Sequence, residues 1–482
     1  MLFNSLQFLV FFPVVTALYF ALPHRLRWLL LLLASCLFYM AFIPVYLLIL
    51  AFTIVVDYGA GIWIEGSQGG RRRLFLVASL VANVGVLAVF KYANFATDNL
   101  TALGRLTGAW GALPLLSIAL PIGLSFHTFQ AMSYTIEVYR GRQPAERHFG
   151  IYALYVMFYP QLVAGPIERP QNLLPQFHAE HRFDHDRVMR GLLQMAWGFV
   201  EKTVIADRLA ILVNHVYDAP GRHGSLELIV ATYAFTFQIF CDFAGYSDIA
   251  LGAARVMGFE LMTNFDRPYF AGSVAEFWSR WHISLSTWFR DYLYIPLGGN
   301  RVPRWRWQVN LLVVFLVSGL WHGANWTYVV WGALHGGYLV CGIWTTGLRR
   351  AMARAVGLDR LPRALGLLRV LFTFHLVAFA WIFFRARSLA DGVHVATHVF
   401  GPVRRADLAG LLTLGLSRFD LILAAASVLM LLGVHGVQRW VSITDLARAA
   451  PAPARWTLYY AAIAGILVLG KFEAQQFIYF QF

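Results

Sequence analysis

The sequence R-W-H-I-S-L-S-T-W-F-R-D-Y at 280–292 and the sequence S-G-L-W-H-G-A-N-W-T at 318–327 place ionisable and polar residues in a chain that otherwise avoids charge. Such groups are costly at membrane depth and indicate a functional site by default. Read at helical spacing, one face carries an aromatic stripe: Trp278, Trp281, Leu285, Trp288 and Tyr292. Ser279, His282 and Ser286 form a polar stripe beside it. The tryptophans alone favour a helix lying in the headgroup layer, but His282 and the serines fit that location less well.

His322 lies where the apolar run Leu311–Leu320 gives way to Gly323. Irregular backbone at membrane depth is tolerated only where protein buries it or where it lines a water-filled cavity. Histidine, with an unperturbed pKa of about 6.5, suits proton transfer near neutral pH. A lone histidine in an apolar segment is more often structural, yet this position favours a site that faces a cavity. His335 follows 13 residues later, which is far round any continuous helix, so spacing does not pair it with His322.

The composition indicates an all-α polytopic membrane protein. Of the 482 residues, 59% are hydrophobic and 13% charged, against about 25% charged in globular chains, and the mean hydropathy is +0.59. The net charge of +14 comes from short basic clusters between apolar runs, which is typical of loops that obey the positive-inside rule and excludes nucleic-acid binding. Cys36, Cys241 and Cys341 lack metal or disulfide spacing, so we expect them to be buried, and no bound metal.

Apolar runs of about 20 residues predict ten to twelve spanning helices. The block 28–63 divides near Pro44, the run 113–139 is broken at Pro121-Ile122-Gly123, and 151–167 is expected to be re-entrant or interfacial. In the run 226–257, Gly245 is expected to break the helix between Asp242 and Asp248, whose spacing makes a carboxylate pair doubtful. Asp242 has two equal interpretations, pairing at a helix break or lining a polar cavity. No long polar region separates a second domain, so 1–482 is expected to form one domain.

These motifs resemble the membrane-bound O-acyltransferase family, in particular its bacterial alginate O-acetyltransferase branch. The likeness extends beyond 280–327 to M-L-F-N-S at Met1, K-Y-A-N-F at Lys91, L-P-I-G-L-S-F at Leu120, P-Q-L-V-A-G-P-I at Pro160, D-F-A-G-Y-S-D at Asp242 and the closing Y-F-Q-F. The resemblance implies a ring of helices around a thinned centre with a tunnel. Peripheral helices at about 1–110 and C-terminal helices at about 346–482 would flank a catalytic core at about 111–345.

The resemblance also implies the chemistry. The histidine of the family's W-H-G motif, its expected base, falls on His322, and the second histidine falls on His282. Acetyl-CoA would be the donor and an extracytoplasmic polysaccharide the acceptor, reached through a periplasmic or membrane-anchored partner of the SGNH-hydrolase type at the bacterial inner membrane. No resident cofactor is implied.

Other residues are candidates for the tunnel or for substrate binding: Trp281, Ser286, Arg290, Asp291, Asn300, Trp321, Asn325 and Asp242. Asn325 could stabilise an oxyanion or cap a helix. Two alternatives stay open. One is a transporter or flippase that uses the same polar residues, and the other is an acyltransferase with another donor, such as a D-alanyl carrier protein.

Overall fold

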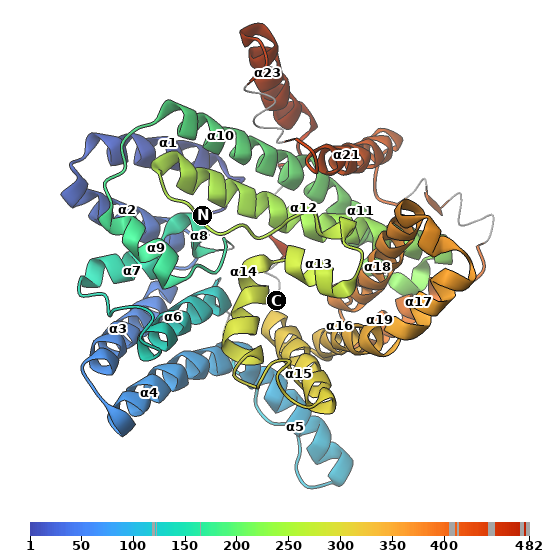
Figure 1. Ribbon diagram of the computed structural model, residues 1–482, viewed down its shortest axis with the longest axis horizontal. Coiled ribbons are helices and arrows are strands. Elements are labelled where there is room, and N and C mark those ends of the chain that lie inside the picture. Colours follow the sequence, from blue (N-terminus) through green and yellow to red (C-terminus); the bar gives the residue numbers. More distant parts are fainter. Residues whose placement is uncertain are drawn as a thin grey trace. The chain divides into compact units, whose positions relative to one another are not determined.

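The protein is built of helices (Figure 1). The computed structural model describes residues 1–117, 121, 123–163, 165–403, 410–411, 414–441, 449–472 and 477–478, and these residues contain no strand. A backbone in lipid must satisfy its own N–H and C=O groups, which favours helices. The all-helical prediction is confirmed for this part of the chain. Parts of four sequence features lie outside the described residues: the break at 118–122, Ala164 in P-Q-L-V-A-G-P-I, Arg404-Arg405, and the closing Y-F-Q-F.

The chain forms two compact units, and the first comprises residues 1–195 and 246–262. Its helices include α1 (Leu6–Ala21), α2 (His24–Met40), α3 (Tyr46–Glu65), α4 (Gly69–Leu87), the π-helical turn η1 (Ala88–Tyr92), α5 (Ala93–Thr107), α6 (Leu124–Tyr139), α7 (Phe149–Met157), α8 (Tyr159–Leu162) and α9 (Pro170–His178). The predicted division near Pro44 is confirmed, because α2 and α3 are separate helices. Asp57 of α3 accepts hydrogen bonds from Ser79 and Asn83 of α4, and such buried polar contacts hold membrane helices together.

The second unit comprises residues 196–245 and 263–482, so the division between the units falls within α10 (His185–Phe199) and α12 (Ser225–Met257). Its first helices are η2 (Val200–Ala206), α11 (Asp207–Tyr217), η3 (Pro220–Arg222), η4 (Pro268–Phe270), α13 (Val274–Arg280), α14 (Ile283–Phe289), η5 (Arg290–Tyr294) and α15 (Arg304–His322). Then come α16 (Trp326–Trp344), α17 (Thr346–Ala355), η6 (Leu358–Arg360), α18 (Pro362–Arg385), α19 (Leu389–His398), α21 (Arg418–Val437) and α23 (Ala452–Leu469).

Six helical segments of the described chain are long and apolar enough to cross a membrane: 46–65, 69–107, 225–257, 362–385, 418–437 and 452–469. The 16-residue helix α1 is apolar but shorter. These segments show that the chain is a membrane protein. The apolar runs predicted ten to twelve spanning helices, whereas six helical segments of the described chain meet the criteria of length and composition. The difference arises because runs such as 113–139 and 151–167 fold into shorter helices.

Gly245 does not break its helix, contrary to expectation, because α12 is continuous from Ser225 to Met257. Gly245 instead allows close packing: a Cβ there would lie 2.6 Å from the carbonyl oxygen of Gly198 and 2.9 Å from the backbone nitrogen of Lys202. The expectation for the cysteines is also wrong in part. Cys241 is buried, but Cys36 is half-buried and Cys341 exposed.

Helices α15 and α16 form a hairpin whose backbones touch through glycines. A Cβ at Gly319 would collide with the backbone of Tyr328, and a Cβ at Gly332 would collide with the backbone of Phe315. Gly323, just after α15, has no room for a side chain beside the ring of Tyr328. Small residues at such spacing let membrane helices approach closely. The packing fixes the end of α15, and therefore His322, against the start of α16.

Candidate active site

The helix predicted through 278–292 is broken at His282. Helix α13 ends at Arg280, α14 begins at Ile283, and His282 has φ 43° and ψ 56°. In the described chain, only Arg267 shares a positive φ among residues other than glycine. A left-handed conformation costs a non-glycine residue about 1–2 kcal/mol. Strain of this kind often accompanies functional sites when the surroundings hold it in place.

The segment N-F-D at 264–266 holds this break. The backbone N–H of Ile283 donates to the carbonyl of Asn264 at 2.9 Å, and the Ser284 hydroxyl donates to the Asn264 side chain at 2.7 Å. The backbone N–H of Asp266 donates to the carbonyl of Arg280 at 2.9 Å. The residues on both sides of the break are therefore hydrogen-bonded to the segment 264–266, and these bonds compensate for the strain at His282.

Because of this break, the predicted aromatic and polar stripes do not form two faces of one helix. Trp281 and Trp288 are buried, so they are not headgroup anchors. Ser279 is exposed while His282 is buried, so the polar residues do not share one face. The periodicity failed because it assumed a continuous helix across a residue that turns the chain. Within α13, Glu276 and Arg280 lie one helical turn apart and form an ion pair with an N–O distance of 2.7 Å.

The structure brings His282 and His322 onto the same indole. The ring of Trp321 lies 6.2 Å from that of His282 and 4.9 Å from that of His322, measured between centroids. Both imidazoles are almost completely buried, at 0% and 3% exposure. His282 also meets the ring of Phe243 edge-on at 4.6 Å. Burial lowers the pKa of His282 to about 3, which keeps its ring neutral at physiological pH.

His322 ends α15 and is surrounded by aromatic rings. Trp331 lies 5.0 Å away and Phe384 5.3 Å away, both near edge-on. These rings come from α16 and α18, so three helices form the wall around one imidazole. Such walls exclude water and strengthen any electrostatic interaction inside them.

His335 is a residue that the spacing argument missed. It is fully buried on α16, and its Nδ1 accepts a hydrogen bond from the indole N–H of Trp278 at 3.1 Å. Its Nε2 has no hydrogen-bond partner among the described residues. Its ring lies 5.0 Å from Trp331, which also contacts His322. The hairpin, rather than a continuous helix, brings the two histidines to the same tryptophan, and the glycines of G-A-L-H-G were the available signal.

Three of the remaining candidates lie near this cluster. Trp281 packs on Trp381 at 5.1 Å, and Trp381 stacks on Trp331 at 5.7 Å. Ser286 donates its hydroxyl to the carbonyl of Trp281 at 3.1 Å. Asn325 is the N-cap of α16, and its side-chain oxygen accepts the N–H of Thr327 at 3.0 Å. Capping therefore occupies that oxygen.

The polar residues after α14 lie in another environment. Arg290 is exposed and pairs with Asp291 at 2.8 Å. Asn300 is exposed in the loop that follows Gly298 and Gly299, which have positive φ. The exposure of Arg290 and Asn300 contrasts with the burial of His282 and His322.

Asp242 belongs to a buried ion cluster. Its carboxylate lies 2.6 Å from the Lys202 ammonium, which is also 2.7 Å from Asp207. Its second oxygen accepts the backbone N–H of Ile478 at 2.7 Å. Asp248 has a different partner, the side-chain amide of Gln194. The doubt about a carboxylate pair is thus supported, and pairing describes Asp242 better than a place beside the histidines.

Comparison with known proteins decides the family. The sequence profile of the membrane-bound O-acyltransferase family matches residues 146–385. The chain is 42% identical to the probable alginate O-acetylase AlgI of Pseudomonas aeruginosa over 425 residues, 85% of this chain and 78% of the relative. The chain belongs to the membrane-bound O-acyltransferase family. It is also 37% identical to the probable alginate O-acetylase AlgI of Pseudomonas putida across the full length of both chains, and 34% identical to the peptidoglycan O-acetyltransferase of Helicobacter pylori over 83% of this chain and 80% of that one.

Membership in the membrane-bound O-acyltransferase family makes this chain an O-acyltransferase, which decides against the transporter alternative. The resemblance drawn from the motifs is confirmed, including the alginate O-acetylase branch. The matched range 146–385 contains His282, His322 and His335 together with every ring described around them.

Proposed function

We propose that this membrane O-acyltransferase moves acetyl groups from acetyl-CoA for O-acetylation of an extracytoplasmic polysaccharide, alginate or a similar exopolysaccharide, with His322 as general base. Relatives that carry the names alginate O-acetylase and peptidoglycan O-acetyltransferase support a polysaccharide acceptor. The bacterial inner membrane is the proposed location, with the donor on the cytoplasmic side. A periplasmic or membrane-anchored protein of the SGNH-hydrolase type is the proposed partner that completes transfer to the sugar.

The observation that carries the proposal is the shared contact of His282 and His322 with Trp321 in a buried aromatic wall. A hydroxyl is a poor nucleophile until a base takes its proton, and a neutral imidazole is suited to that role. A dry site also protects a thioester from hydrolysis. Two buried histidines on one indole therefore fit acyl transfer better than they fit a packing role alone.

In the proposed step, the acceptor oxygen attacks the thioester carbonyl carbon while its proton passes to His322. The carbon–sulfur bond then breaks, and the leaving thiolate takes the proton back from the imidazolium. The products are an O-acetyl ester and free CoA, so atoms and charge balance. His282 would position the donor or polarise its carbonyl, since its ring contacts the same indole as that of His322.

The test uses the purified full chain in lipid with radiolabelled acetyl-CoA, an SGNH-type partner and a polysaccharide acceptor. We expect His322→Ala to lose about 100-fold to 10,000-fold of the CoA release, the usual contribution of a general base. His282→Ala should also lower the rate. His375→Ala is the matched control, because His375 is an exposed histidine of the same unit.

Wild-type rates from His322→Ala, with folding confirmed by gel filtration and thermal unfolding, would disprove the assignment of the base. If the wild type releases no CoA with partner and acceptor present, the donor is not acetyl-CoA. A D-alanyl carrier protein is then the next donor to assay, and the family assignment stands unchanged.

A further inference from the structure

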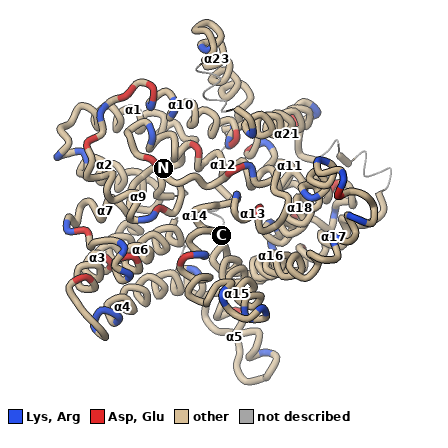
Figure 2. The backbone as a smooth tube through the Cα atoms, viewed as in Figure 1, with Lys and Arg blue, Asp and Glu red and all other residues tan. Residues whose placement is uncertain are grey.

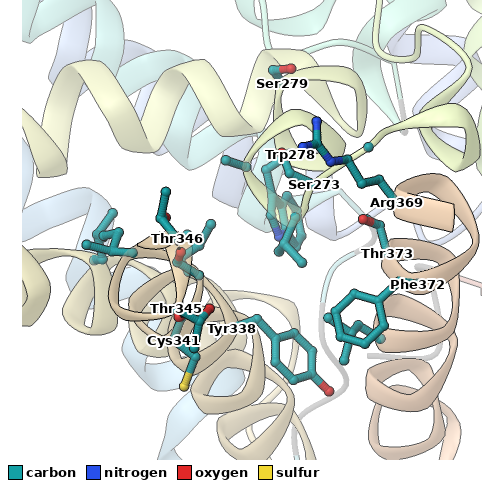
Figure 3. A pocket seen from close by; sticks show the side chains of 18 of the residues that line it. Ser273, Trp278, Ser279, Tyr338, Cys341, Thr345, Thr346, Arg369, Phe372 and Thr373 are labelled. Carbon is teal, nitrogen blue, oxygen red and sulfur yellow. Dashed lines mark hydrogen bonds between the residues drawn. The ribbon is translucent and has the colours of Figure 1, made fainter. Parts of the chain in front are cut away.

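A large cavity lies beside the histidine cluster in the second unit (Figure 3). Its volume is about 1330 Å³, and residues of α13 to α18 line it. Neither His282 nor His322 lines it. Most of its wall is aliphatic or aromatic, with side chains such as Leu311, Val314, Leu339, Ile343, Leu368 and Phe372. An acetyl group is far too small to need such a wall.

The rim of the cavity is basic. Arg290, Arg349, Arg350 and Arg369 line it, and the described lining includes no Asp or Glu. Arg349 donates to the carbonyl of Gly342 at 2.7 Å, while no ion pair in the described chain involves Arg349, Arg350 or Arg369. These three guanidinium groups are exposed. An apolar cavity therefore has exposed arginines in its wall that form no ion pair in the described chain.

Helix α17, beside the cavity, is amphipathic and exposes apolar side chains. Leu348, Met352 and Val356 repeat every four residues, are about 60–68% exposed, and line the cavity. Arginines occupy other positions of the same helix, as the blue segments along α17 in Figure 2 show. An amphipathic helix with exposed apolar residues and arginines is typical of a helix that lies in the lipid interface. Basic clusters beside membrane helices attract anionic lipids.

We propose that this cavity binds one anionic phospholipid, with its phosphate on Arg349 and Arg369 and an acyl chain along α16 and α18. The lining residues of α18 run from Leu365 to Leu376, which is about 16 Å of helix. That length is close to half of the roughly 30 Å hydrocarbon core, the depth of one leaflet. CoA carries phosphates too, but it has no long apolar segment to fill the wall. Charge and wall chemistry together select the lipid.

The proposed lipid would touch the active-site wall. Trp278 lines the cavity (Figure 3), and its indole N–H donates to Nδ1 of His335 at 3.1 Å. A chain packed against Trp278 would restrict that ring and so support the hydrogen bond. This inference concerns a site distinct from the two proposed catalytic histidines, and it stands whether or not acetyl-CoA proves to be the donor.

The test titrates delipidated full-length protein with phosphatidylglycerol or phosphatidylcholine of the same acyl chains, read by native mass spectrometry. We expect phosphatidylglycerol to bind more tightly, and the double variant Arg349→Gln/Arg369→Gln to bind it about tenfold more weakly. The matched control is Arg360→Gln/Arg363→Gln, which removes the same charge from the same connector at exposed positions outside the cavity. The control should bind within about twofold of wild type.

A second measurement follows the acyl chain. Cys341 is exposed and lines the cavity, so in a Cys36→Ser background a maleimide should label it, and phosphatidylglycerol should slow the labelling. Cys341→Trp should weaken lipid binding by filling the space without disturbing a buried contact. Equal binding of both lipids, equal losses in the two arginine doubles, or protection of Cys341 by acetyl-CoA but not by lipid would overturn the proposal.

Discussion

Two buried polar clusters of the second unit differ in how their ionisable groups are accommodated. Lys202, Asp207 and Asp242 are at most 3% exposed, and the Lys202 ammonium lies 2.6 Å from Asp242 and 2.7 Å from Asp207. His282, His322 and His335 are buried to the same degree but are surrounded by indole and phenyl rings. The first cluster resembles a structural ion network, and the second resembles a chamber that keeps imidazoles dry.

Burial of an ionisable group therefore does not identify a reactive site by itself. The groups that surround it distinguish a structural cluster from a reactive one. A buried cluster in which two carboxylates share one cation has little capacity left for a substrate, and removing the cation is costly. An imidazole against aromatic edges stays neutral, which is the form that can accept a proton from a hydroxyl. Four predictions test this contrast.

The largest effect should come from Lys202→Met, which leaves Asp207 and Asp242 as buried carboxylates without their cation. Removal of one partner from a buried ion pair typically costs about 3–5 kcal/mol. Thermal unfolding in detergent, followed by tryptophan fluorescence, measures the loss. The control is the triple variant Lys202→Met/Asp207→Asn/Asp242→Asn, which should recover most of the stability. If the single variant unfolds like wild type, the cluster is not a structural network.

Glu168 in the first unit lies between the two extremes. It is buried and accepts hydrogen bonds from the Met262 backbone N–H and the Asn172 amide, and burial raises its pKa to about 7. A raised folded-state pKa contributes stability that is present below about pH 4.5 and lost as the pH rises through about 7. The shift corresponds to roughly 3 kcal/mol. Wild type should lose stability between about pH 4.5 and pH 7, and Glu168→Gln should lose much less. Parallel pH profiles for the two proteins would rule out this titration.

The left-handed residue offers a test that is independent of side-chain chemistry. His282→Ala and His282→Gly both remove the imidazole, but only alanine is strained at φ 43°. We expect the glycine variant to be more stable by about 1 kcal/mol. Ser286, inside α14, is the matched position at which alanine should be more stable than glycine by a similar amount. The same order of stability at both positions would show that the break at His282 is absent.

The smallest effect should follow Trp278→Phe, which removes the N–H that donates to His335. A single buried hydrogen bond contributes about 0.5–1.5 kcal/mol. His335→Phe should cost a similar amount, and the double variant should cost less than the sum, because both changes remove one interaction. Trp344→Phe on the exposed end of α16 is the control and should change little. Strict additivity in this cycle would mean that the pair does not interact.

The positions of long apolar helices could be predicted from the sequence, but some breaks between helices could not. The apolar run 226–257 located α12 within one residue at each end, because a membrane helix needs a continuous apolar segment. Apolar runs did not reveal the break at His282, since neither proline nor glycine marks it. The hydrogen bonds that Asn264 accepts and Asp266 donates, 18 and 16 residues before His282, impose that conformation.

Long-range pairs were equally hidden from local patterns. Lys202 and Asp242 are 40 residues apart, and no spacing rule connects them. His335 was set aside because a continuous helix would place it on another face from His322. The turn at Gly323 removed that premise and brought both rings to Trp331. His282 and His322 were predicted by motif, and their meeting at Trp321 became visible only in the folded chain.

The glycine contacts of the α15–α16 hairpin carry a consequence for how this protein tolerates change over evolution. Gly319 and Gly323 face α16, while Gly332 and Gly336 face α15, and each position has a neighbour within contact distance of an added methyl group. None of the four performs chemistry. In a saturation library selected for activity, these glycines should nevertheless accept as few substitutions as His322, because a displaced backbone would move the base away from its substrate. The positions that tolerate few substitutions would therefore include the contact glycines of the hairpin as well as the reacting groups.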